Sequence, residues 1–231
     1  METSPPTPSQ IVVIGASTGG IDALRTIVGA LPHDFAPAIF VVLHMAADSP
    51  GILASILQRA GRLPAVAVST RHPIRTGTIY VAAPDRHLLV DRNRAIATRG
   101  PKENRFRPAV DPLFRSAAQT FGAGAIGVIL SGGLDDGSAG LLAIQQQGGT
   151  AIVQDPATAL NPSMPQNALS RVVVDHCVPV EEIAPLLMRL AGARLCQPAR
   201  PAASLAGCAA FLRQSHPELR VGLEEFREFV R

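Results

Sequence analysis

The chain has 231 residues, of which 47% are hydrophobic and 17% are charged, and its formal net charge is +3. This composition is that of a globular protein that buries a core, as one large domain or one domain with appendages. Its 3 cysteines, without C-x-x-C spacing, argue against a disulfide framework and a thiolate metal site and suit a reducing compartment. The opening METSPPTPSQ is no signal peptide, and no apolar run approaches the roughly 20 residues of a membrane helix. We therefore expect a cytoplasmic protein.

The first part of the chain alternates strands and helices. We expect residues 1–9, rich in proline, serine and threonine, to be disordered. The apolar run IVVI, starting at Ile11, predicts a buried strand, and IDALRTIVGAL after the glycine turn has the apolar spacing of an amphipathic helix. A second apolar run at residues 38–43 and a helical pattern in PGILASILQRAG repeat this order. The repetition predicts parallel strands covered on both faces.

The middle of the chain departs from this order. Residues 77–100 alternate apolar and polar side chains around short turns, which predicts antiparallel strands at an edge or flap of the sheet. The following DPLFRSAAQTF is typical of a helix capped by Asp111, with Pro112 at its first position.

Strands and helices alternate again in the last part of the core. We expect strands at residues 125–130 and 150–154, a helix between them that ends at Gly148, and a last helix in VEEIAPLLMRLAG that Pro185 interrupts or starts. The prediction is an α/β domain over residues 10–193, with a mostly parallel, doubly wound sheet and a small antiparallel hairpin region at one edge.

The composition changes after this domain. Residues 194–231 begin with the linker-like CQPARPAAS and end with VGLEEFREFVR, which has the pattern of a short amphipathic helix. We expect this C-terminal extension to pack on the core or to dock a partner.

Basic residues crowd one region of the sequence. They are Arg71, Arg75, Arg86, Arg92, Arg94, Arg99, Lys102, Arg105 and Arg107. One interpretation is a solvated surface, and the other is a surface that binds an acidic macromolecule. Nucleic acid is the weaker version of the second, because the chain has no tryptophan and a single tyrosine on which bases could stack.

The first glycine turn does not fit a phosphate-binding motif. In IVVIGASTGG, Ser17 replaces the middle glycine of a dinucleotide fingerprint, and Ile21 stands where a P-loop needs lysine. What remains is a serine between a buried strand and a helix N-terminus, as in a nucleophile elbow, although the letters are not G-x-S-x-G. The alternative is that Ser17 only caps the helix.

Two further polar residues follow buried strands. His44 comes directly after residues 38–43, and Asp135 and Asp136 follow the strand expected at residues 125–130. Sites in open parallel sheets form outside the carboxyl ends of the strands, so these groups fall on the same edge as Ser17. Each also has a structural alternative, as a satisfied polar residue or a helix cap. Asp111 is a rival acid, but capping a helix explains it.

The remaining histidines give no sign of a metal centre. They are His33, His72, His87, His176 and His216, and they lack the spacing of metal ligands. A zinc hydrolase is therefore not expected.

Several stretches together carry a family resemblance. They are IGASTGG with Ser17, VVLHM with His44, PAVDPLF at residues 108–114, LSGGLDDGSAG with Asp136, and MPQNAL at residues 164–169. Over roughly residues 10–190 the chain resembles the catalytic domain of the bacterial chemotaxis protein-glutamate methylesterases of the CheB type. The resemblance implies a Rossmann-like α/β domain with a catalytic triad of Ser17, His44 and Asp136.

The resemblance also implies the reaction and the partner. A serine hydrolase of this type demethylates glutamate γ-methyl esters on chemoreceptors and releases methanol, and some members also deamidate glutamine. The expected oxyanion donors are the backbone N–H groups of Thr18 and Gly133, and no metal or organic cofactor is needed. The expected partner is the methylated cytoplasmic domain of a chemoreceptor, toward which Arg105 and Arg107 would be steering charges. We expect neither nucleic-acid binding nor membrane insertion.

Two departures from the family pattern stand out. Gly133-Leu134 replaces the usual Met-Gly before the acid. Only ten residues precede the first expected strand, so we expect the chain to lack the usual N-terminal phosphorylatable receiver domain. Two alternative functions stay open: a non-catalytic binding or regulatory module on the same fold, and a serine esterase or amidase with a different substrate.

Overall fold

The computed structural model describes residues 9–193. The predictions of a disordered N-terminus and of a linker with a C-terminal helix fall on residues 1–8 and 194–231, which lie outside the described part of the chain.

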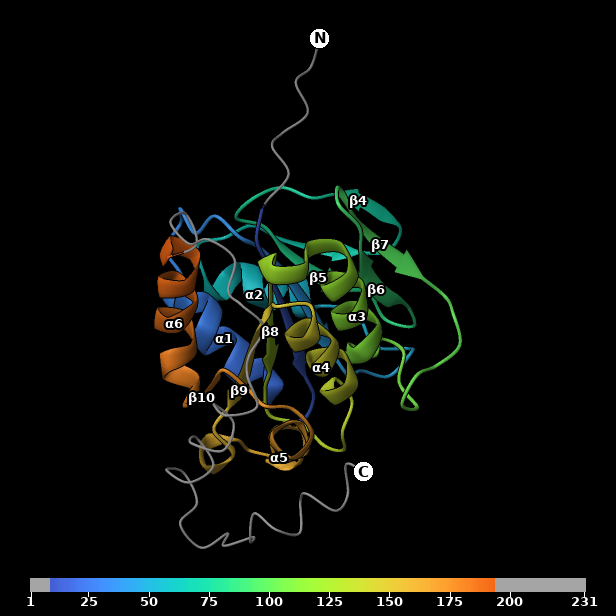
Figure 1. Ribbon diagram of the computed structural model, residues 1–231. Helices are drawn as coiled ribbons and strands as arrows, with labels where there is room; N and C mark the ends of the chain where they lie inside the picture. The colour runs from blue at the N-terminus through green and yellow to red at the C-terminus, as the bar shows by residue number, and fades with distance from the viewer. Residues whose placement is uncertain (1–8, 194–231) are drawn as a thin grey trace, which may run out of the picture. The chain divides into compact units, whose positions relative to one another are not determined.

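The described residues form a parallel sheet and a small antiparallel one (Figure 1). The strands of the 7-stranded parallel sheet lie in the order β10-β9-β8-β1-β2-β5-β3. Their bounds are β1 Ile11–Ala16, β2 Ala38–Leu43, β3 Ala65–Val68, β5 Ile79–Ala82, β8 Ala125–Ile129, β9 Thr150–Gln154 and β10 His176–Val178. The 3-stranded antiparallel sheet contains β4 Arg71–Pro73, β7 Arg94–Thr98 and β6 His87–Val90, in that order.

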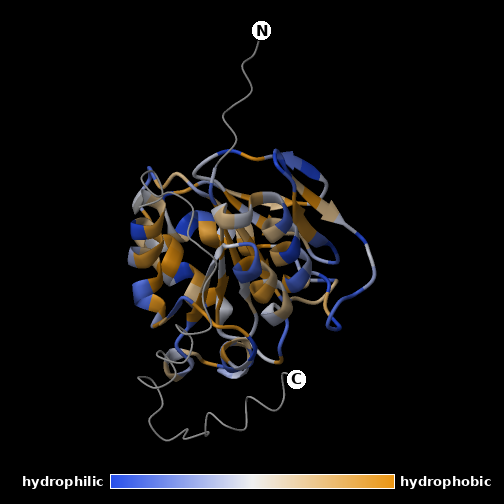
Figure 2. Ribbon diagram, in the orientation of Figure 1, coloured by the Kyte–Doolittle hydropathy of each residue, from blue (hydrophilic) through white to orange (hydrophobic). Residues whose placement is uncertain are grey.

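Helices cover both faces of the parallel sheet. Their bounds are α1 Gly20–Ala30, α2 Leu53–Ala60, α3 Val110–Phe121, α4 Ser138–Gln146, α5 Ser163–Arg171 and α6 Val180–Ala193, with short 3-10 turns at Gly122–Gly124 and Pro156–Thr158. One buried cluster joins the sheet to α1, α2 and α6, and the other joins it to α3, α4 and α5. Successive β1 residues alternate between them, since Val12 belongs to the first cluster and Val13 to the second. Figure 2 shows the corresponding apolar layers between polar outer helix faces.

The expected fold class is confirmed, with two local corrections. Ile79–Ala82 is not an antiparallel flap strand but lies between β2 and β3 in the parallel sheet, because all four of its residues are buried. Pro185 neither starts nor interrupts the last helix, since α6 runs through it from Val180. Pro185 is the sixth residue of α6, so its missing N–H removes one intrahelical hydrogen bond, the one that would reach the Glu181 carbonyl.

Between residues 9 and 193, no helix combines the length and the apolar character that a membrane crossing requires.

Candidate active site

Three neighbouring strands deliver the predicted site residues to one edge of the sheet. Strand β1 lies between β2 and β8, so the loops after these strands are adjacent. Ser17 follows β1 and its N–H donates to the Ser131 carbonyl at 2.9 Å, while the His44 N–H donates to the Ala16 carbonyl at 3.0 Å. Asp136 comes from the longer loop after β8. These backbone bonds fix where the serine and the histidine leave the sheet.

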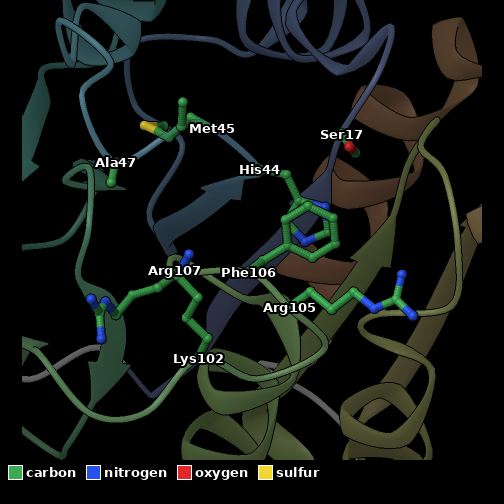
Figure 3. A pocket seen from close by; sticks show the side chains of 9 residues that line it. Ser17, His44, Met45, Ala47, Lys102, Arg105, Phe106 and Arg107 are labelled. Carbon is green, nitrogen blue, oxygen red and sulfur yellow. The ribbon is translucent and has the colours of Figure 1, made fainter.

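A pocket of about 400 Å³ opens at this edge (Figure 3). Its lining residues are Ser17, His44, Met45, Ala46, Ala47, Lys102, Arg105, Phe106 and Arg107. The lining brings together a hydroxyl and an imidazole from two strand ends and a basic segment that precedes α3.

His44 is bound to the carboxylate of Asp136. Its Nε2 lies 2.6 Å from Oδ2 of Asp136, and the two side chains are 3% and 0% exposed. The other ring nitrogen, Nδ1, is buried and has no hydrogen-bond partner among the described residues. Because a carboxylate only accepts, it favours the tautomer with the proton on Nε2. That tautomer leaves the Nδ1 lone pair free to accept a proton.

The Asp136 carboxylate receives four hydrogen bonds. Oδ2 accepts from His44 and from Val110 N–H at 2.7 Å, and Oδ1 accepts from the Asn104 side-chain amide at 2.7 Å and from Asp111 N–H at 3.1 Å. Burial raises the pKa of this carboxyl, but the bonds from His44, Val110 and Asn104 outweigh it and hold the pKa below its usual value. Asp136 is therefore kept ionised beside the imidazole.

Asp111 does not cap its own helix, which corrects the sequence prediction. The residue before α3 is Ala109, and the Asp136 carboxylate accepts the first N–H groups of the helix instead. The Asp111 carboxylate accepts from Gly140 N–H at 2.7 Å and from Asn104 Nδ2 at 2.8 Å. Burial is the main reason that the pKa of Asp111 is raised, and the nearby charge of Asp136 adds to it.

The segment Glu103–Phe106 forms a tight turn over the imidazole. Glu103 and Phe106 exchange backbone hydrogen bonds of 3.1 and 2.8 Å, and the two residues between them have φ values of 48° and 71°. The Phe106 ring is stacked on His44, with ring centroids 3.7 Å apart and an angle of 7° between the planes. The stacked rings overlap in Figure 3. Phe106 thus covers one face of the imidazole, a role that no sequence pattern indicated.

Arg105 and Arg107, the two arginines expected to steer a partner, differ in whether they are paired with an acidic residue. Arg107 donates to the carboxylate of Asp85 from Nε at 2.9 Å, and it donates to the Gly100 carbonyl at 2.6 Å. The hydrogen bond from Arg107 is the main reason that the pKa of Asp85 is lowered. Arg105 is exposed and forms no ion pair within residues 9–193, and the two side chains extend to opposite sides in Figure 3. Arg105 is therefore the unpaired charge of the two within residues 9–193, whereas Arg107 is paired with Asp85, and the steering role of both stays a prediction.

Comparison with known proteins identifies the family. Residues 12–187 match the family model described as CheB methylesterase. The chain belongs to the CheB methylesterase family. The solved catalytic domain of Thermotoga maritima CheB methylesterase superimposes with a TM-score of 0.75 at 31% identity, covering 81% of this chain and 100% of that domain. The family and the fold expected from the resemblance are thus confirmed.

Relatives of the CheB family chain carry names that agree with this family. A Leptospira interrogans protein, whose name assigns protein-glutamate methylesterase and protein-glutamine glutaminase activity provisionally, is 38% identical over 182 residues, 78% of this chain and 94% of the relative. Anaeromyxobacter dehalogenans protein-glutamate methylesterase/protein-glutamine glutaminase 4 is 40% identical over 187 residues, 79% of this chain and 52% of the relative. The alignment thus spans nearly all of the first relative and about half of the second.

A loop of this CheB family chain lies against the serine turn. The hydroxyl of Ser131 donates to the Thr18 carbonyl at 2.7 Å and accepts from Asn161 N–H at 2.9 Å. Gly132 is tightly enclosed, since a Cβ there would lie 2.8 Å from Cβ of Ser17 and would also meet Met164. Ser131 and Asn161 hold the loop. No local sequence pattern indicated either residue, because their contacts join segments that are distant in the sequence.

The two N–H groups expected to bind an oxyanion are free. Within the described chain, neither the Thr18 nor the Gly133 backbone N–H donates a hydrogen bond. Leu134, the next residue, adopts the left-handed conformation with φ of 67° and is 50% exposed. The CheB family chain therefore carries a leucine in a backbone conformation that favours glycine, at a cost of roughly 1 kcal/mol.

No group of three or more His, Cys, Asp or Glu side chains in residues 9–193 is arranged to hold a metal ion.

Proposed function

We propose that the chain is a serine hydrolase that demethylates glutamate γ-methyl esters, and deamidates glutamine side chains, on chemoreceptors. The observation that carries the proposal is the buried 2.6 Å bond from His44 Nε2 to Asp136, with Nδ1 unpaired and Ser17 lining the same pocket. Family membership supports the reaction class, and the names of the relatives supply both activities.

The first half-reaction forms an acyl-enzyme. Ser17 Oγ attacks the ester carbonyl carbon while its proton passes to Nδ1 of His44. Asp136 stabilises the resulting imidazolium through Nε2–H. The tetrahedral intermediate then collapses, and the methoxide leaving group takes the proton from Nδ1 and departs as methanol.

The second half-reaction restores the serine. Water gives a proton to Nδ1 and attacks the acyl-enzyme, and Ser17 leaves with that proton, releasing a glutamate side chain. A glutamine side chain follows the same route with ammonia as the leaving group. Both activities in the relatives' names therefore need only one set of groups.

The negative oxygen of each intermediate needs hydrogen-bond donors. The backbone N–H groups of Thr18 and Gly133 are the donors in this proposal, supported by their lack of partners within residues 9–193. The start of α1, directly after Gly19, adds a favourable dipole. Loss of one oxyanion donor typically slows a reaction on the order of 10²- to 10³-fold.

The pocket rim suits an acidic protein substrate. Lys102 and Arg105 are exposed, line the pocket and form no ion pair in the described part of the chain. Charges on a rim raise the rate of encounter more than the final affinity. The two positive charges therefore support a protein substrate whose modified glutamates lie among acidic residues.

The proposal is tested by methanol release from a methylated chemoreceptor cytoplasmic domain. Wild type is expected to release methanol, and Ser17→Ala to lose activity by on the order of 10⁴-fold or more. Ser170→Ala is a matched control, because Ser170 is exposed on α5, bonds only within its own helix and does not line the pocket. Methanol release by Ser17→Ala at the wild-type rate, or none by wild type, contradicts the proposal.

A further inference from the structure

The side chain of Asn104 joins two buried carboxylates. Its Nδ2 donates to Asp136 Oδ1 at 2.7 Å and to Asp111 Oδ2 at 2.8 Å. Asp136 and Asp111 are 1% and 6% exposed. An amide NH₂ has two N–H donors and carboxylates only accept, so Nδ2 is the atom of Asn104 that suits this place.

We infer that Asn104 is a positioning residue, whose amide bridges Asp111 and Asp136 so that Oδ2 of Asp136 stays directed at His44. The inference rests on the proposed function for its kinetic readout. Asn104 itself need touch neither the substrate nor the imidazole.

The distribution of donors around Asp136 supports this role. Oδ2 is shared by His44 and Val110 N–H, whereas Oδ1 is held by Asn104 and by the longer bond from Asp111 N–H. A carboxylate that is held at both oxygens cannot rotate about its χ2 angle without breaking bonds on each side. Loss of the Asn104 bond would leave Oδ1 with only the 3.1 Å contact.

The second carboxylate makes the bridge necessary. Asp111 and Asp136 both reach the same nitrogen, and two such charges in a buried site repel each other. The other titratable groups that face the pair are His44, bound to Asp136, and Arg115, whose charge acts on Asp111. Without Asn104, no side-chain donor in the described residues would separate the carboxylates, and a proton shared between them would weaken the hold on His44.

The turn that carries Asn104 is built for this contact. Asn104 has φ of 48°, which asparagine tolerates better than most residues, and the turn is tied to α3 by a 2.6 Å ion pair from Glu103 to Arg115. The same turn stacks Phe106 on His44. One short turn thus holds the acid through Asn104 and the face of the base through Phe106.

The test removes the amide without changing the turn. Asn104→Gly accepts the left-handed backbone and is expected to lower kcat/KM on the order of 10- to 100-fold, mainly through kcat. Asp111→Asn supplies the second background, because it removes the opposing charge and offers its own amide to Asp136. In that background Asn104→Gly is expected to lower kcat/KM less than about threefold. This non-additivity would show that Asn104 and Asp111 are coupled, and a damaged turn would not produce it.

A second readout is independent of catalysis. Titration of the Asp136 carboxyl followed by ¹³C NMR is expected to give a higher pKa in Asn104→Gly than in wild type. Equal kinetic losses in both backgrounds, or an unchanged Asp136 titration, overturn the inference. If wild type hydrolyses no ester, the proposed function fails, and the titration still decides the role of Asn104.

Discussion

Two turns border the pocket and are held by different kinds of contact. The turn after β1 is fixed by its backbone: Ser17 N–H bonds the Ser131 carbonyl, and Gly19 takes a left-handed φ of 80° before α1. The Glu103–Phe106 turn is fixed by side chains, through Asn104 on two carboxylates and Phe106 on an imidazole. Backbone contacts at the sheet edge, together with the Ser131 hydroxyl on the Thr18 carbonyl, thus position the serine turn, whereas side chains of a loop outside the sheet orient the acid and the base.

Among variants of the residues that the Glu103–Phe106 turn holds, the largest effect is expected at Asp136, which is bonded to Asn104 and to His44. Asp136→Asn removes the charge that supports the imidazolium and places an amide opposite His44, so kcat is expected to fall about 10³- to 10⁴-fold. The variant also weakens the cap of α3 at Val110 and Asp111. Steady-state methanol release and thermal unfolding separate the two consequences.

Asp136→Glu is the matched control for that variant, since it keeps the charge but not the geometry. Activity close to wild type in Asp136→Asn, with the protein folded, would show that the site does not need the carboxylate.

The role of the exposed side of the Glu103–Phe106 turn in binding the receptor is tested by substituting Arg105. Arg105→Glu is expected to lower kcat/KM for the receptor about tenfold more than for a small methyl ester at low salt, because Arg105 is exposed and unpaired among residues 9–193. The difference should shrink as salt is raised. Competition between the two substrates measures it directly.

Arg107→Gln provides the contrast within the same turn region. It breaks the bonds to Asp85 and Gly100, so both substrates should lose activity together and the melting temperature should fall. A receptor-selective loss in Arg107→Gln, and none in Arg105→Glu, would reverse the assignment of the two arginines.

The ionisation of Asp111, on the buried side of the turn, is tested by the pH dependence of stability. Burial raises the pKa of Asp111 above its unfolded value, so the folded state takes up its proton first and wild type loses stability as pH rises through that pKa. Asp111→Asn has no such loss. The stability of the variant relative to wild type is therefore expected to grow from about pH 4 to pH 7 in urea unfolding. A difference that is flat or shrinks over this range contradicts a raised pKa of Asp111 in the folded state.

The smallest effect is expected in the loop after β8. Leu134→Gly relieves the left-handed φ of 67° and loses little burial, so a gain of about 0.5–1 kcal/mol in unfolding free energy is expected. Leu160→Gly is the control, because Leu160 is 77% exposed and is not among the residues with positive φ. A gain in both variants, or in neither, would contradict strain at Leu134.

Much of the fold followed from local sequence patterns. Apolar runs such as Ile11–Ala16 and Ala38–Leu43 have the lengths of buried parallel strands, and the residues after them, Ser17 and His44, fall at one sheet edge. The prediction for Ile79–Ala82 was wrong because a periodic pattern does not show which sheet a strand joins. Strand ends are thus readable from sequence, and strand partners are less so.

The contacts between distant segments could not be predicted in this way. A local capping rule assigned Asp111 to its own helix, whereas the cap of α3 comes from Asp136, 26 positions from Val110. Asn104 is likewise 32 positions from the carboxylate that it holds. Nothing in the spacing of these residues indicates the left-handed turn that brings them together.

The activation of Ser17 by His44 is tested most directly by labelling with a serine-directed fluorophosphonate, followed by mass spectrometry of the modified peptide. We expect rapid modification of Ser17 in wild type, modification slowed on the order of 10³-fold or more in His44→Ala, and none at this position in Ser17→Ala. Equal labelling of Ser17 in wild type and His44→Ala, or labelling of another serine in its place, would contradict a Ser17 nucleophile activated by His44.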